Sequence, residues 1–162
     1  MKPTSVVSAS ADVTQPASGQ SLQRGLRQGY VLVSALLALA ILFQVFLAGG
    51  GLFAEPGWWP THQMLGMALS AAPLLLLALG IAARLPGRLL WLNGLLLVLV
   101  ALQPFLISAP EQWAAPTLKS LHVVNALLMF ALTALLGQQV WQRLTRPFAV
   151  AFAAASEQRD AR

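Results

Sequence analysis

The sequence predicts an all-α integral membrane protein, built as an up-down bundle of four membrane-spanning helices. Its 162 residues are 57% hydrophobic and 9% charged, whereas about 25% of residues are charged in soluble domains. Four apolar runs, at 30–48, 61–83, 89–109 and 118–142, have the length of about 20 residues that a hydrocarbon core of about 30 Å requires. These runs leave no room for a soluble catalytic domain.

Three regions follow from this pattern. Residues 1–28 are rich in Ser, Ala, Thr and Gln without apolar periodicity, so we expect a disordered cytoplasmic N-terminal segment. Residues 29–146 form the transmembrane domain, and residues 147–162 form a cytoplasmic tail with too few apolar residues to cross the membrane. The first apolar run is longer than the core of a cleavable signal peptide.

The net charge of +5 is explained by the ends of the spans. The basic residues there are Arg24 and Arg27 before the first run, Arg84 and Arg88 between the second and third, and Arg143 and Arg146 after the fourth. The other two loops carry Glu55 and Glu111. By the positive-inside rule both termini are cytoplasmic, and we expect a multi-pass protein of the bacterial inner membrane. The bilayer is the expected partner, and nucleic acid is not.

Helix-breaking residues and tryptophans mark the ends of the spans. The first run ends at three glycines, 49–51, which allow a tight exit or a close helix approach. Trp58 and Trp59 stand where an interfacial aromatic belt is expected. Pro73 should kink the second span near mid-membrane. The short turn at 84–88 makes the second and third spans antiparallel neighbours.

Polar residues inside the spans repeat in a way that indicates two duplicated hairpins. Gln44 is followed 18 residues later by His62, and Gln103 is followed 19 residues later by His122. Counted from the cytoplasmic arginines at 1.5 Å per residue, both histidines lie roughly 32 Å away, at the outer edge of the core. Asn125 falls in the same outer half.

The two histidines are therefore candidate ligands. The second and fourth spans of an up-down bundle lie diagonally across its axis, so His62 and His122 should face each other. Gly66 and Ala126 follow them by four residues on the same helix faces. These small residues would leave space for a flat macrocycle between the helices.

The chain resembles a small bacterial family of four-helix membrane proteins without established activity, over about residues 28–145. The motifs that carry the resemblance are HQMLG at 62–66, LQPFL at 102–106 and LHVVNALLMF at 121–130. More distantly, the pattern is similar to one half of haem A synthase and to other four-helix b-type cytochromes with two histidines. That resemblance implies that His62 and His122 are axial ligands of haem b. Trp59 stands where the synthase pattern has a glutamate, so the synthase's oxidase chemistry is not implied.

Two functional hypotheses remain open. In the first, the protein binds one haem b near the periplasmic face and transfers electrons to or from a redox partner protein or a quinone. In the second, it is a non-catalytic membrane subunit or scaffold whose histidines are structural. Gln44, Gln103 and Asn125 either support the histidines or join helices by hydrogen bonds.

Other chemistries find less support in the composition. Met64, Met67 and Met129 could serve as soft copper ligands, although methionine usually fills space in apolar helices. The absence of cysteine excludes thiolate-held clusters and covalent haem attachment through thiols. No acidic residue lies within a span, which disfavours a proton-coupled transporter, and no nucleophile with a partner base is recognisable.

Overall fold

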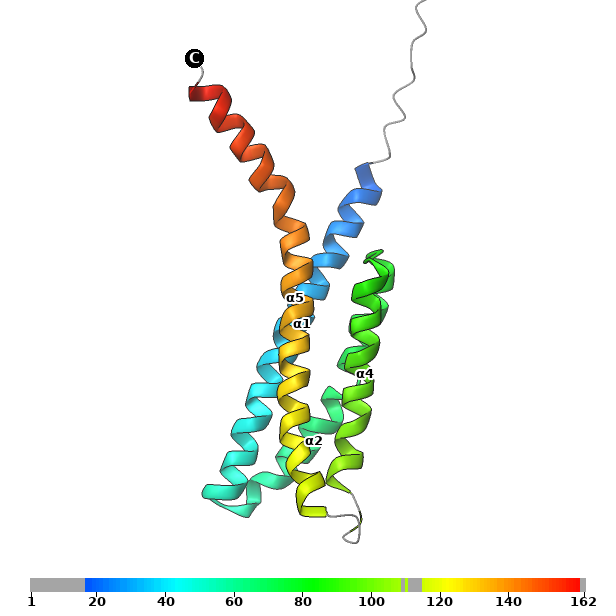
Figure 1. Ribbon diagram of the computed structural model, residues 1–162, viewed down its shortest axis with the longest axis vertical. Helices are drawn as coiled ribbons and strands as arrows, with labels where there is room; N and C mark the ends of the chain where they lie inside the picture. The colour runs from blue at the N-terminus through cyan, green and yellow to red at the C-terminus, as the bar shows by residue number, and fades with distance from the viewer. Residues whose placement is uncertain (1–16, 109, 111–114, 161–162) are drawn as a thin grey trace, which may run out of the picture.

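A computed structural model describes residues 17–108, 110 and 115–160, and the side chains of 19–108, 110 and 117–145. The described chain is entirely helical apart from turns (Figure 1). Its elements are α1 (Ala17–Phe53), the short 3₁₀ helix η1 (Pro56–Trp58), α2 (Trp59–Leu69), α3 (Ala72–Ala82), α4 (Gly87–Ile107) and α5 (Ala115–Asp160). The predicted all-α class is confirmed.

Four helical segments are long and apolar enough to cross a membrane. They are Gly19–Phe53, Pro56–Ala82, Gly87–Ile107 and Thr117–Thr145, so the four predicted spans are confirmed. Large apolar side chains such as Leu32, Val98 and Leu127 are more than half exposed on their outer surfaces. Such a surface suits a lipid environment rather than water. The chain is a multi-pass integral membrane protein.

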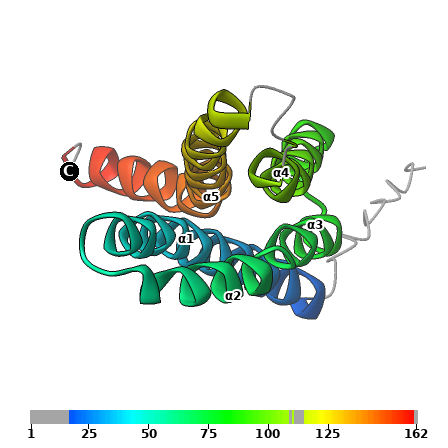
Figure 2. The same ribbon diagram turned by 90° about the horizontal axis from the view of Figure 1, so that it is seen from below.

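The spans form a ring in chain order. Helix α1 packs on α5 and on both halves of span two, and α4 packs on α3 and α5. Figure 2 shows α1 and α2 on one side of the bundle and α4 and α5 on the other. The second and fourth spans are therefore diagonal, as the up-down arrangement predicted.

Span two is interrupted near its middle. Helix α2 ends at Leu69 and α3 begins at Ala72, with Ser70 and Ala71 in a turn. Pro73 follows in the first turn of α3, where its missing N–H leaves no hydrogen bond unmade. The kink predicted from Pro73 is thus confirmed, and it amounts to a full break between two half-helices.

The outer helices are longer than the sequence predicted. Helix α1 already begins at Ala17, so residues 17–28 are helical, and the expectation of disorder is wrong for them. Leu26 packs against the core, which gives this segment an apolar anchor that composition alone obscured. Residues 1–16 lie outside the described residues. Helix α5 likewise continues to Asp160 through most of the expected tail, and the two helices diverge beyond the bundle (Figure 1).

A polar network crosses the apolar core. Tyr30 Oη donates to Asn93 Oδ1 at 3.1 Å, and Asn93 Nδ2 donates to the Pro73 carbonyl at 3.0 Å. Tyr30 and Asn93 are each only 1% exposed, so these bonds satisfy groups that would otherwise lie unpaired in a medium without water. The network joins the first, second and third spans at the level of the break.

Candidate functional site

The two histidines come together at the end of the bundle that carries the α1–α2 loop. His62 is the fourth residue of α2 and His122 is the eighth residue of α5. Their ring centroids are 6.4 Å apart, and the ring planes are inclined by 59°. The predicted pairing of the two imidazoles across the bundle is therefore present.

The orientation of His62 is fixed by helix α1. His62 Nδ1 lies 3.1 Å from the main-chain carbonyl oxygen of Gln44, and Gln44 Nε2 donates to the His62 carbonyl at 3.0 Å. A carbonyl can only accept, so the contact requires the proton of a neutral imidazole to be on Nδ1. Nε2 is then the nitrogen with the free lone pair.

His122 repeats this arrangement in the second hairpin. Its Nδ1 lies 3.4 Å from the main-chain carbonyl oxygen of Gln103, on α4. Each histidine thus contacts the carbonyl of the glutamine that precedes it by 18 or 19 residues on the neighbouring span. The common geometry supports the two-hairpin duplication that the spacing predicted. Sequence reasoning missed that the partner is a main-chain atom, because every residue carries a carbonyl.

The amide side chains around the pair carry unpaired acceptors. Gln44 Oε1, Gln103 Oε1 and Asn125 Oδ1 are buried without a hydrogen-bond partner. Asn125 Nδ2 donates to the Leu99 carbonyl at 2.8 Å, which fixes Oδ1 as the orphan oxygen. Gln44 and Asn125 therefore join helices by hydrogen bonds, while Gln44 and Gln103 also position histidines through their main chains.

Gly66 lies close to the side chain of Gln44. A Cβ atom on Gly66 would lie 3.1 Å from Gln44 Nε2. The missing side chain thus makes room for the Gln44 amide from α1. Ala126 is partly buried on α5.

Trp59 packs against His62, and both Trp58 and Trp59 lie close to the glycines at the end of α1. The Trp59 ring meets the imidazole edge to face, with centroids 5.8 Å apart and planes at 87°. Cβ atoms at Gly50 and Gly51 would lie 2.6 Å from the Trp58 ring and 2.7 Å from the Trp59 ring. The close approach predicted for this glycine run is therefore an approach of tryptophan rings to the end of α1.

The three methionines suggested as copper ligands have different surroundings. Met64 and Met67 are 65% and 71% exposed, and Met129 is buried beside Asn125 Nδ2. Within the described residues no three His, Cys, Asp or Glu side chains are grouped so as to hold a metal ion. The described site therefore brings together two imidazoles.

Comparison with known proteins finds a match for part of the chain. Residues 44–109 match a family of unknown function (DUF6220), a range that includes Gln44, His62 and Gln103 but ends before His122. No curated protein and no solved structure matches the chain. The expected similarity to a family without established activity is confirmed over this range. The resemblance to haem A synthase and b-type cytochromes gains no support from these comparisons.

Proposed function

We propose that the protein binds one haem b through His62 and His122 and acts in electron transfer. The observation that carries the proposal is the separation of the two imidazoles, with centroids 6.4 Å apart. Nitrogen–metal bonds of about 2.0–2.1 Å place the centroids of two rings on opposite sides of one ion roughly 6 Å apart. The pair is therefore spaced as two axial ligands would be.

The Nδ1 contacts support the same assignment. Histidines that bind metals commonly donate the other ring N–H to a carbonyl or carboxylate, which fixes the tautomer and raises the basicity of the ligand nitrogen. His62 and His122 each have Nδ1 at a main-chain carbonyl, at 3.1 Å and 3.4 Å. A backbone partner is held in place by its helix and does not depend on a side-chain rotamer.

The number of ligands favours haem over a bare ion. A structural zinc site takes four protein ligands, and the described residues gather two imidazoles without a third His, Cys, Asp or Glu. Haem supplies the four equatorial nitrogens itself and needs only axial ligands from the protein. If His62 and His122 both held the iron, they would leave no position on it for a substrate. Electron transfer, which needs none, is thus the function that fits best.

Location follows from the distribution of arginines. The histidine pair and the arginines lie at opposite ends of the spans, and the positive-inside rule assigns the arginine end to the cytoplasm. We therefore place the protein in the bacterial inner membrane with both termini cytoplasmic and the histidine pair near the periplasmic face. A periplasmic redox protein or a membrane quinone could reach the pair there. Reporter fusions at Gly57 and Arg162 test this, and periplasmic activity of the Arg162 fusion would reverse it.

Visible spectroscopy tests haem binding. The full chain is produced in haem-replete cells and purified in mild detergent, and reduced-minus-oxidised spectra are recorded with haem quantified per chain. We expect stoichiometric haem that is lost in both His62→Ala and His122→Ala. Gln63→Ala and Val123→Ala are matched controls, because both side chains are exposed neighbours of the histidines, and they should keep the spectrum. Folded, colourless protein would instead favour a scaffold in which the same Nδ1 contacts only join helices.

A further inference from the structure

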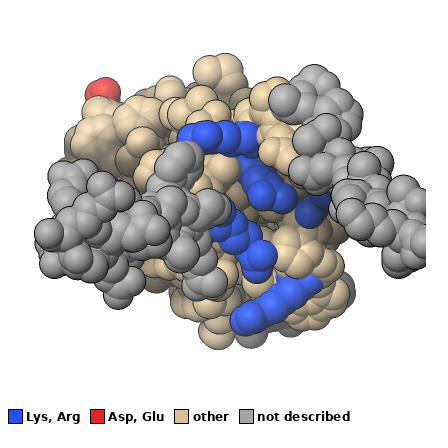
Figure 3. Space-filling view, turned by 90° about the horizontal axis from the view of Figure 1, so that it is seen from above, with Lys and Arg blue, Asp and Glu red and all other residues tan. Residues whose placement is uncertain are grey.

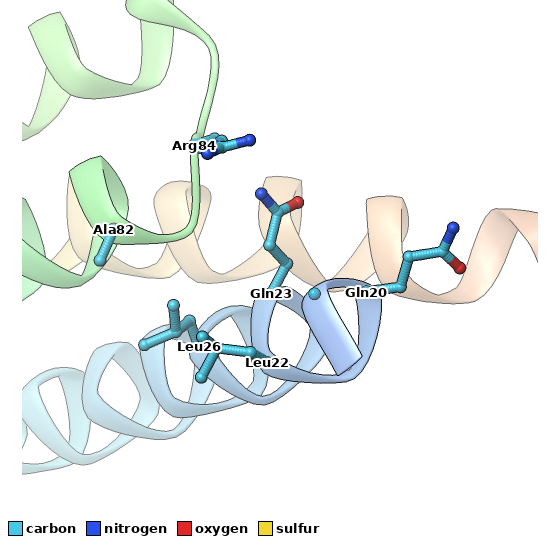
Figure 4. Close-up of a pocket in the computed structure, with 7 residues that line it drawn as sticks. Gln20, Leu22, Gln23, Leu26, Ala82 and Arg84 are labelled. Carbon is cyan, nitrogen blue, oxygen red and sulfur yellow. The ribbon is translucent and has the colours of Figure 1, made fainter. Parts of the chain in front are cut away.

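A pocket lies at the end of the bundle opposite the histidine pair. It has a volume of about 490 Å³ and is formed between the start of α1 and the turn from α3 to α4 (Figure 4). Its lining residues are Gly19, Gln20, Leu22, Gln23, Leu26, Ala82 and Arg84. Amide and guanidinium groups therefore share this space with leucine side chains, so the pocket is polar on one part of its wall and apolar on another.

Arg84 has a backbone conformation that favours glycine. Its φ is 52°, and it occupies the residue after the C-cap of α3, where Leu85 N–H bonds to the Gly80 carbonyl at 2.9 Å and Arg84 N–H to the Ile81 carbonyl at 3.0 Å. This helix ending usually uses glycine, because other residues are strained there. A strained residue that is not glycine points to a role for its side chain. In Figure 4 the Arg84 and Gln23 side chains extend from different elements toward the same space.

Basic residues lie at the same end of the bundle as the pocket. Arg27 follows Gln23 by one turn on the same face of α1, and its Nε is buried without a hydrogen-bond partner. Figure 3 shows basic side chains gathered on this end of the molecule. Glu55, the one acidic residue whose side chain the structure describes, lies in the α1–α2 loop at the opposite end. The described part of the pocket region therefore offers cations without a carboxylate of its own.

We propose that this pocket binds the headgroup of an anionic phospholipid of the phosphatidylglycerol class. The Arg84 guanidinium and the Gln20 and Gln23 amides supply donors for a phosphate, as basic pockets between transmembrane helices do. Leu22, which is 65% exposed, and Leu26 supply an apolar surface for the glycerol and the first acyl carbons. That surface favours a lipid over a free phosphate ion, and the pocket lies at the end of the spans, where headgroups are found.

Native mass spectrometry of the full chain in micelles tests the site with phosphatidylglycerol, phosphatidylcholine and glycerol phosphate as probes. Arg84→Gly is the decisive variant, because it removes the guanidinium while giving the backbone the residue that its φ of 52° prefers. Loss of binding in a variant with unchanged or raised melting temperature is then not caused by misfolding. Gln23→Leu removes an amide at nearly constant volume. Arg143→Gln is the matched control, since Arg143 is exposed and does not line the pocket.

We expect saturable retention of one phosphatidylglycerol, weakened at least about fivefold by Arg84→Gly and less than about twofold by Arg143→Gln. Gln23→Leu should also weaken retention. Equal losses in Arg84→Gly and Arg143→Gln would overturn the proposal in favour of general surface attraction. Equal retention of phosphatidylcholine, or displacement of the lipid by stoichiometric glycerol phosphate, would overturn it as well.

Discussion

Gln44 and His62 exchange two hydrogen bonds, one from the Gln44 side chain to the His62 carbonyl at 3.0 Å and one from His62 Nδ1 to the Gln44 carbonyl at 3.1 Å. The two bonds close a ring between α1 and α2. One of them uses a side chain that can be replaced. The other, which orients the imidazole, uses a main-chain atom that survives substitution of Gln44.

Gln44→Leu should therefore leave the orientation of His62 intact. The change removes the bond to the His62 carbonyl but also removes the buried, unpaired Oε1, so we expect a loss of stability of no more than about 1 kcal/mol. Denaturation in mixed micelles measures the stability, and the visible spectrum reports haem. A variant that loses haem as completely as His62→Ala would show that the side chain, and not the carbonyl, positions the ring.

Gly66→Leu should lower the stability of the protein more than Gln44→Leu does. A Cβ at Gly66 would lie 3.1 Å from Gln44 Nε2, so the amide must shift by a few tenths of an ångström and its bond to the His62 carbonyl weakens; we expect a leucine there to lower the stability by about 1–3 kcal/mol. The effect should depend on Gln44. In a Gln44→Ala background the same change should cost clearly less, and a double-mutant cycle of unfolding free energies measures the difference. Strict additivity would contradict the assigned contact.

The glycines at the end of α1 should differ sharply in their tolerance of alanine. Cβ atoms at Gly50 and Gly51 would lie 2.6 Å and 2.7 Å from tryptophan rings, whereas a Cβ at Gly49 meets no atom within 4 Å. We expect Gly50→Ala and Gly51→Ala to lower stability by about 1–3 kcal/mol and to shift tryptophan fluorescence. Gly49→Ala is the internal control and should be neutral or slightly stabilising. Equal effects at all three positions would exclude the tryptophan contacts as the cause.

Tyr30→Phe should destabilise the bundle without affecting the histidine pair. It leaves Asn93 Oδ1 without its donor in the core, which costs about 1 kcal/mol. Asn93→Leu removes two hydrogen bonds, one of them to the Pro73 carbonyl. It should therefore lower the stability more than Tyr30→Phe does. If the two changes were additive in the double variant, Tyr30 and Asn93 would not be coupled.

Much of the architecture was predictable because the bilayer restricts it. Apolar run lengths placed the four spans, and equal distances from the arginines placed His62 and His122 at one level. Chain order in an up-down bundle then made the second and fourth spans diagonal. Each of these inferences depends on length and periodicity, which the sequence states directly.

The contacts that define the site were less predictable. The carbonyls that meet His62 and His122 belong to main chain and leave no mark on the sequence. The direction in which Gly66 faces is set by the rotation of α2 about its own axis. Because span two is broken at Ser70, the apolar pattern of α3 does not predict that rotation. The sequence weakly indicated the hydrogen bond between Tyr30 and Asn93, because both are polar residues within apolar runs.

The break in span two also gives its two halves different packing partners. Helix α3 packs on both α1 and α4, whereas the main helix–helix contact of α2 is with α1 alone. A sideways displacement of α2 would therefore strain its contacts with α1 while the α3–α4 interface stayed closed. If haem binds at His62 and His122 as proposed, its entry beside α2 would disturb the contact between α1 and α2 and leave the packing of α3 on α4 in place.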